Sequence, residues 1–260
     1  MGGALLEGWF QRGLSPVDAI VVEPAGRDAV APCADHRALT VLPHAKDVPS
    51  DFLPDVVLFA VKPQIVNGVI PDYVRFAEHR PVFLSVIAGK STSFFRGHLG
   101  DNAAVVRAMP NTPAAVGKAT SVLYAAPAAS EVQKRVCEVL MGAVGSVEWL
   151  AEEAFMDAVT AVSGSGPAYV FLLAECMRDA GIAAGLPPDL AARLANSTIA
   201  GASAMLEQDT ARPEVLRQNV TSPGGTTAAA LEILMGEGGL EQLMTRAVAA
   251  AAKRSKDLAG

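Results

Sequence analysis

The chain is organised around the stretch NVTSPGGTT, residues 219–227, which runs directly into the apolar helical pattern of residues 228–235. A polar loop with paired glycines that opens a helix points backbone N–H groups and the positive end of the helix dipole at whatever lies in front of it. Gly224 and Gly225 carry no Cβ that would block a small ligand. The pattern predicts an anion site, although Ser, Thr and Gly also cap helices that bind nothing.

Residues 152–260, which surround this stretch, contain helical segments punctuated by Gly and Pro and no strand-like run. We expect a domain boundary here, which divides the chain into residues 1–151 and 152–260. Alanines recur within the helical segments and allow close helix approach. Because one chain would leave much of this small-residue surface uncovered, we expect two copies to interlock as a homodimer about a two-fold axis. Helices are expected at residues 153–162, 168–184, 190–207, 214–220, 227–235 and 240–258.

Residues 1–151 show a different pattern, in which near-continuous apolar runs of strand length alternate with helical or loop segments. Such runs imply burial on both faces, hence an α/β domain with a parallel sheet and helices on either side. Ligands of these sheets bind beyond the carboxyl ends of the strands, which places residues 60–63 and 86–89 at a cofactor crevice. The runs lie at residues 19–23, 40–42, 56–61, 82–87 and 104–107, followed by strands near 120–124 and 147–149 and a helix near 131–141.

The composition argues against several classes of function. A net charge of -6 provides no basic field for nucleic acid. The most apolar segment, residues 155–174, is interrupted by glycines and a proline, so we expect buried helices rather than a membrane span, and no signal peptide is visible. The histidines do not fall at ligand spacing, so we expect no metal site. The scattered cysteines Cys33, Cys137 and Cys176 indicate buried thiols in a reducing cytoplasm.

Residues 213–218, PEVLRQ, with the stretch that follows through Leu231, resemble the signature of the pyrroline-5-carboxylate reductases, which make proline by reducing a cyclic imine. The resemblance continues backward through residues 158–169, 107–113 and 60–63, and it covers essentially the whole chain. It implies hydride transfer from NADPH or NADH to a five-membered ring imine with one carboxylate, the last step of proline biosynthesis. It also implies a Rossmann-like doubly wound sheet followed by an all-helical dimerisation domain.

The resemblance assigns the cofactor to loops of the predicted sheet. Relatives use the loops at residues 60–63 and 86–89 for contacts to ribose and nicotinamide. The proline-rich loop at 109–113 resembles a floor beneath the nicotinamide, although it would also serve as a simple crossover turn. One family contact is missing, because Ala45 stands where relatives can have an asparagine. The cofactor-binding candidates in these loops are Ala60, Val61, Lys62, Pro63, Val86, Ile87, Ala88 and Asn111.

The first residues depart from the family pattern, in which a strand ends in a G-x-G-x-M-G run that opens a helix. Met1 and Gly2 match only the tail of this fingerprint, and we expect both to contact the cofactor. The departure implies a sheet that is truncated at its N-terminus. We expect such a truncation to leave two unpaired strand edges beside a gap and to weaken dinucleotide binding.

Glu23 is a candidate reader of the cofactor's ribose. It lies about 20 residues after Gly2, where an acidic side chain meets a ribose hydroxyl in dinucleotide folds. Its carboxylate would repel a 2′-phosphate, and Arg27 could compensate, so the choice between NADPH and NADH stays open. Glu23 would equally be a solvated acid at the end of a strand.

The resemblance also implies how the substrate is held. Backbone N–H groups of Gly225, Thr226 and Thr227 would hold the carboxylate. The Thr227 hydroxyl would lie near the imine nitrogen, orienting the ring and assisting protonation, which makes Thr227 the catalytic candidate. Asn219 and Glu153 match family positions that contact the substrate. Glu153, at the head of a predicted helix, would equally serve as an N-terminal dipole partner.

Two other hypotheses stay open. A related hydroxyacid dehydrogenase also joins a dinucleotide domain to a helical one, but it relies on a lysine in the second domain, where this chain has none before Lys253. A degenerate oligomer without enzymatic activity would keep the helical dimer and lose cofactor binding. Relatives in the reductase family dimerise through the helical domain, and many assemble further into decamers.

Overall fold

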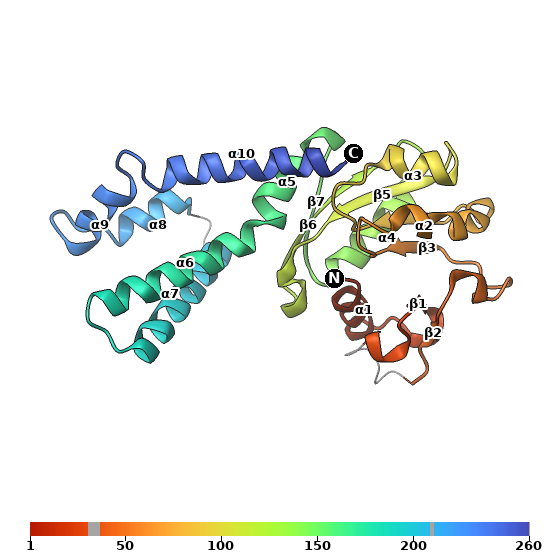
Figure 1. Ribbon diagram of the computed structural model, residues 1–260, viewed down its shortest axis with the longest axis horizontal. Coiled ribbons are helices and arrows are strands. Elements are labelled where there is room, and N and C mark those ends of the chain that lie inside the picture. Colours follow the sequence, from red (N-terminus) through yellow and green to blue (C-terminus); the bar gives the residue numbers. More distant parts are fainter. Residues whose placement is uncertain (31–36, 209–210, 260) are drawn as a thin grey trace. The chain divides into compact units, whose positions relative to one another are not determined.

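The computed structural model describes residues 1–30, 37–208 and 211–259, which form two compact units (Figure 1). The first unit comprises Met1–Gly164 together with the segment that begins at Ala252, and the second comprises Ser165–Ala251. The sequence pattern places the boundary at residue 151, whereas this division falls after Gly164. The difference arises because Met156 and Ala161, just after the sheet, are fully buried within the first unit.

The strands of the first unit form two sheets in the described part of the chain. In the smaller sheet β1 pairs with β2, and in the larger one the order is β3-β4-β5-β6-β7. All pairs are parallel except β5 with β6. The predicted strands and their parallel pairing are confirmed, but the antiparallel direction of β6 was not predicted. The bounds are β1 Ile20–Val22, β2 Thr40–Leu42, β3 Val56–Phe59, β4 Val82–Ser85, β5 Ala104–Met109, β6 Ala119–Ala125 and β7 Gly145–Trp149.

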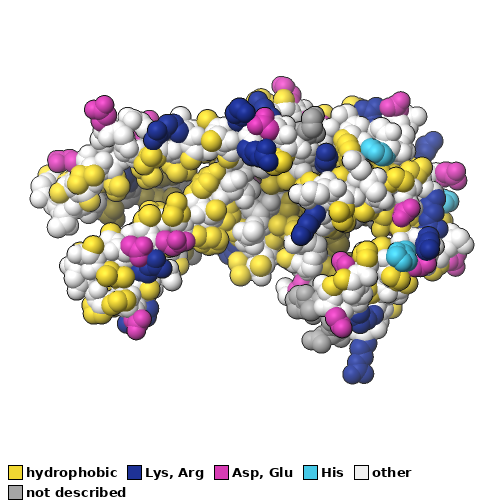
Figure 2. Space-filling view, in the orientation of Figure 1, with side chains coloured by type: hydrophobic (Ala, Val, Ile, Leu, Met, Phe, Trp, Pro, Cys, Tyr) yellow, Lys and Arg dark blue, Asp and Glu magenta, His cyan; other side chains and the backbone are white. Residues whose placement is uncertain are grey.

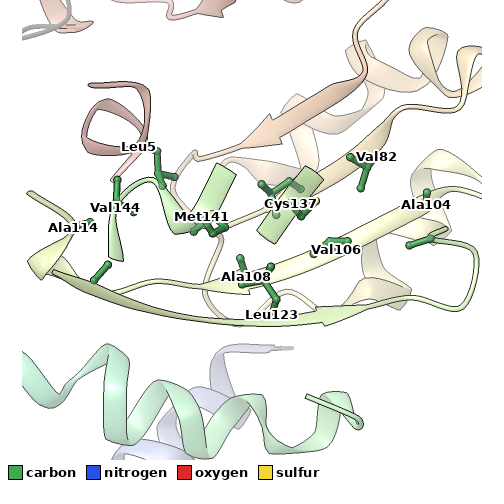
Figure 3. Packing of buried hydrophobic residues seen from close by; sticks show 13 residues of the cluster. Leu5, Val82, Ala104, Val106, Ala108, Ala114, Leu123, Cys137, Met141 and Val144 are labelled. Carbon is green, nitrogen blue, oxygen red and sulfur yellow. The ribbon is translucent and has the colours of Figure 1, made fainter. Parts of the chain in front are cut away.

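Helices cover both faces of the larger sheet. Neighbouring strand residues point to opposite faces, so Leu84 enters one apolar cluster and Phe83 the other. The first cluster includes Leu5 and Met141 from two helices on one face (Figure 3). The second includes Phe95, and Ile20 of the smaller sheet packs against it. The helices of this unit are α1 Gly2–Gln11, α2 Val66–Val69, α3 Thr92–Leu99, α4 Glu131–Gly142 and α5 Met156–Val159, with 3₁₀ turns that include η5 Ile70–His79 and η7 Glu153–Phe155, and a π-helical turn, η8 Thr160–Gly164.

In the described residues of the second unit every regular element is a helix, as the sequence predicts. Its helices are α6 Gly166–Ala183, α7 Pro188–Gln208, α8 Pro213–Asn219, α9 Thr226–Leu234 and the first part of α10 Leu240–Ala259. Among its described residues only Ala191 and Ala195 are buried hydrophobic residues. Large apolar side chains are instead exposed along these helices (Figure 2). They include Val170, Phe171, Leu172, Leu173, Leu194, Met205, Leu206, Ile233, Leu234 and Met235.

The cysteines test the expectation of buried thiols. Cys137 is buried in the first unit, as expected, but Cys176 is exposed on α6, so the expectation is wrong there. The physical reason is that α6 has no buried residue. Cys33 lies outside the described residues. Throughout the described ranges, every helix is too short or too polar to cross a bilayer.

Candidate active site

The carboxyl ends of three parallel strands bring the predicted cofactor loops to one edge of the larger sheet. Phe59, Ser85 and Arg107 are paired across β3, β4 and β5, so the residues that follow them meet at the same edge. Ala60 and Lys62 are exposed there. Ile87 is only 2% exposed, because its side chain packs in the core. Ala60 and Lys62 are therefore open to a cofactor at this edge, whereas Ile87, a predicted cofactor residue, is enclosed by the protein.

The amino end of α1 lies against the same edge. A Cβ added to Gly2 would stand 3.1 Å from the Cβ of Ala60, so glycine permits the close approach of α1 to the end of β3. Met1 is the N-cap residue, the helix has no side-chain cap, and its first turn contains no acidic residue. The positive end of the α1 dipole is thus directed at the cofactor edge, where it suits a pyrophosphate.

Glu23 follows β1 and is held by its own turn. Its Oε1 accepts a hydrogen bond from the Ala25 N–H at 3.0 Å, and its backbone N–H donates to the Leu42 carbonyl at 2.9 Å. The Arg27 guanidinium donates to the Leu39 carbonyl. Part of the Arg27 guanidinium is therefore engaged with the protein, and the Glu23 carboxylate is oriented by its own turn.

Asn111 joins three segments through its side-chain amide. Its Nδ2 donates to the carbonyl and the Oγ of Ser163, both at 3.3 Å, and its Oδ1 accepts from the Thr120 N–H at 3.0 Å. Beside it, a Cβ on Gly164 would stand 2.5 Å from the Cε of Met109. The amide of Asn111 is therefore committed to protein partners, and the loop is a rigid surface of the kind a nicotinamide floor requires.

Glu153 lies within the first unit, with its carboxylate at the amino end of α3. Oε1 accepts from the Thr92 N–H at 2.8 Å and Oε2 from the Thr92 Oγ1 at 2.7 Å. Nη1 of Arg107 lies 3.3 Å from Oε1, and the two side chains are 7% and 21% exposed for Arg107 and Glu153. Arg107 is therefore nearly enclosed by the protein, whereas the Glu153 carboxylate is only partly shielded from solvent. The negative charge of Glu153 thus lies at the positive end of the α3 dipole, and not at the start of the helical turn that contains Glu153 itself.

The predicted substrate loop lies in the second unit and opens α9 as expected. Gly225 is the N-cap residue, so Thr226 and Thr227 stand in the first turn, which contains no acidic residue and no side-chain cap. A Cβ on Gly225 would stand 3.1 Å from the Ser222 carbonyl, and its N–H donates to that carbonyl at 3.0 Å. The amides of Thr226 and Thr227 are therefore the better-placed donors. Asn219 ends α8 and is exposed.

Sequence reasoning missed three residues that organise these positions. Arg107 was expected only as part of a strand and Ser163 only as part of the stretch 158–169, and Thr92 was not singled out. A charged residue inside an apolar strand run was the available signal for Arg107, since a buried charge requires a partner.

Comparisons with known proteins connect this geometry to a family. Residues 153–258 match the family described as "Pyrroline-5-carboxylate reductase dimerisation". A pyrroline-5-carboxylate reductase of Pisum sativum is 39% identical over 264 residues, which cover 99% of this chain and 92% of the relative.

Solved structures agree over the same length. The structure of a pyrroline-5-carboxylate reductase from Coxiella burnetii has a TM-score of 0.90 and 32% identity, covering 98% of this chain and 93% of that one. The Plasmodium falciparum pyrroline carboxylate reductase, solved with NADP bound, has a TM-score of 0.84 and 26% identity, with 100% and 95% covered.

Proposed function

The chain belongs to the pyrroline-5-carboxylate reductases, and from this premise we propose that it reduces 1-pyrroline-5-carboxylate to L-proline with a hydride from NADPH or NADH. The observation that carries the proposal is the resemblance at 39% identity over 99% of the chain, which includes the loop that opens α9. A hydroxyacid dehydrogenase is set aside, because the helical region has no lysine before Lys253 to supply its catalytic group.

The residues at the cofactor edge fit a dinucleotide. Gly2 leaves no side chain between α1 and Ala60, and the α1 amino end would hold the pyrophosphate. The loops at residues 60–63 and 86–88 would contact ribose and nicotinamide. The loop at residues 109–113, which the Asn111 hydrogen bonds hold in place, would lie beneath the nicotinamide. When bound, the reduced nicotinamide supplies the hydride.

The residues at the start of α9 would hold the imino acid. Backbone N–H groups of Thr226 and Thr227 bind the carboxylate, Gly225 lets it approach, and Asn219 lies at the end of the preceding helix. The Thr227 hydroxyl donates a hydrogen bond to the imine nitrogen, which orients the ring and favours protonation of that nitrogen as the hydride arrives.

We also propose that the second unit pairs with a second copy of the chain. Its exposed apolar side chains and the match to the reductase dimerisation family support this assembly. Such dimers would assemble further into a decamer, and light scattering distinguishes a decamer from a dimer by its mass. We expect the protein in the cytoplasm, because free cysteines such as Cys137 and Cys176 suit a reducing compartment.

A matched pair of substitutions tests the function. We expect wild-type protein to oxidise reduced nicotinamide when given pyrroline-5-carboxylate and to yield proline. Thr227→Ala should lower kcat at least about tenfold with little change in cofactor affinity, because it removes one hydrogen bond to the reacting ring. Thr226→Ala, one residue earlier in the same turn, should retain near wild-type kcat, because only its backbone is used. Turnover of hydroxyacids in place of the cyclic imine would contradict the assignment.

A further inference from the structure

The carboxylate of Glu153 is fixed to the element that follows the candidate nicotinamide loop. Both of its oxygens accept from Thr92, through the backbone N–H at 2.8 Å and the hydroxyl at 2.7 Å. Thr92 is itself only 5% exposed and is the first residue of α3. Arg107 on β5 compensates the carboxylate charge from 3.3 Å. Glu153 therefore links the start of the helical region to a neighbouring strand and to the first turn of α3.

The segment held in this way is the β4–α3 loop, residues 86–91. At its first end, the Ile87 N–H donates to the Ser85 Oγ at 3.2 Å. At its second end, the Ser91 Oγ accepts from the Phe94 N–H at 3.1 Å and caps α3. Between these ends, Val86 and Ala88 are half-buried at the cofactor edge. A shift of Thr92 would move the loop, because Ser91 precedes it directly.

A second contact reaches the same loop from the last turns of α10. Gly89 has a φ of +74°, and a Cβ added there would stand 3.2 Å from the Leu258 carbonyl. The end of α10 belongs to the first unit and is anchored there, since the Ser255 Oγ donates to Asp157 Oδ1 at 2.6 Å. The loop is therefore held at Thr92 by Glu153, which precedes the second unit in the chain, and at Gly89 it lies against the end of α10, which follows that unit.

We propose that Glu153 is a positioning residue for dinucleotide binding, which acts through Thr92 on the β4–α3 loop. The proposal rests on the proposed function, in which this loop contacts the nicotinamide and its ribose. The orientation of the carboxylate supports it, because both oxygens accept hydrogen bonds from Thr92 and Arg107 balances the charge. Loss of these bonds frees the loop and weakens dinucleotide binding, while the α9 loop keeps its own contacts to the substrate.

The test compares two substitutions at Thr92 in the full chain. Thr92→Val keeps the shape and the backbone N–H but removes the hydroxyl donor, so the dissociation constant for NADH and for NADPH should rise about threefold to tenfold. Thr92→Ser restores the donor and should bring the constant back to within about twofold of wild type. Nicotinamide fluorescence gives the constants without any turnover, and thermal unfolding shows whether each variant is folded.

A second pair isolates the carboxylate. Glu153→Gln should raise both dissociation constants more than Thr92→Val does, because it removes the charge and replaces one acceptor by a donor. Glu152→Gln is the matched control, since Glu152 is adjacent and exposed, and it should leave the constants unchanged. The KM for pyrroline-5-carboxylate at saturating cofactor should stay near the wild-type value in all four variants.

Two results would overturn the inference. A raised KM for the imino acid with unchanged dinucleotide constants would make Glu153 a substrate contact. A lowered unfolding temperature with both quantities unchanged would leave it a purely structural residue. Wild-type protein that binds dinucleotide but does not reduce pyrroline-5-carboxylate would contradict the proposed function alone, because the dissociation constants of the variants still decide the role of Glu153.

Discussion

The two units of the molecule differ in where their apolar side chains lie. In the first unit three apolar clusters enclose residues such as Leu84, Phe95 and Val105, each 0% exposed. In the described part of the second unit only Ala191 and Ala195 are buried hydrophobic residues, while Phe171 is 61% exposed. The first unit therefore surrounds its own core, and the second presents the apolar surface of a core that one copy does not complete.

This contrast explains how one chain divides its tasks. A self-contained core fixes the strand ends that would hold a dinucleotide, and it does so within one copy. Helices without a core of their own gain stability by burying apolar surface against another copy. Cofactor binding should therefore be a property of the first unit, whereas assembly should be a property of the second.

The largest effect should come from charging the apolar surface of the second unit. Val170 and Leu173 lie three residues apart on α6, so they share a helix face. Each buried interface side chain of this kind contributes on the order of 2 kcal/mol, so Val170→Glu with Leu173→Glu should weaken association by about a thousandfold or more. Light scattering should then show single chains at concentrations where wild-type protein is assembled.

A matched double variant in the first unit provides the control. Val132 and Val139 are also exposed and lie on α4, seven residues apart on one face. Val132→Glu with Val139→Glu should leave both the oligomer mass and the unfolding temperature near the wild-type values. If the two double variants dissociate alike, the contrast between the units is not the cause of assembly.

An intermediate effect is expected at the cofactor edge. The Glu23 carboxylate, oriented by the Ala25 N–H, would repel the 2′-phosphate of NADPH. Glu23→Ser should therefore shift the ratio of dissociation constants toward NADPH by about tenfold and leave the oligomer mass unchanged. Asp18→Ser, at the other end of β1, should leave that ratio unchanged. An unaltered ratio in Glu23→Ser would mean that this residue does not read the phosphate.

The smallest effect concerns thiol reactivity. Burial raises the pKa of Cys137 to about 12, from a usual value of 9.0, so at about pH 8 its thiol is almost wholly protonated and unreactive. Cys176 is exposed on α6 in the single chain. Alkylation followed peptide by peptide should label Cys176 in the dissociated Val170→Glu, Leu173→Glu variant and spare Cys137. Equal labelling of the two would indicate that the first unit opens as readily as α6.

The stability of the first unit should follow the same pKa shift with a defined sign. The unfolded thiol loses its proton above about pH 9, whereas the folded one retains it until about pH 12. Between these values the unfolded chain binds fewer protons than the folded one. The contribution of Cys137 to stability is therefore full below pH 9.0 and decreases as the pH rises toward 12.

Elements with a strong local pattern could be predicted from the sequence. The run at 82–87 contains β4, whose residues are all buried, because a strand covered on both faces needs apolar residues at every position. The loop before α9 was predictable because proline limits the backbone and glycine permits the left-handed conformation, and Gly224 does adopt a φ of +68°. The helices of the second unit follow their predicted ranges for the same reason.

Features that depend on distant partners could not be predicted. The pairing of Glu153 with Arg107 and Thr92 requires the sheet, α3 and η7 to be in place, and no periodicity in the sequence encodes it. The bonds from Asn111 to Ser163 and Thr120 are of the same kind. The antiparallel direction of β6 could not be predicted either, because an apolar run specifies a strand but not its orientation.

The return of α10 to the first unit has a consequence for the order in which the protein folds. Residues from Ala252 onward are synthesised after all of Ser165–Ala251, yet they belong with the sheet that was made first. On the ribosome the strands and Glu153 emerge early, whereas the contact between Leu258 and Gly89 must wait for the whole helical region. Contacts so distant in sequence form late and slowly. The first unit therefore begins to fold first and is completed last.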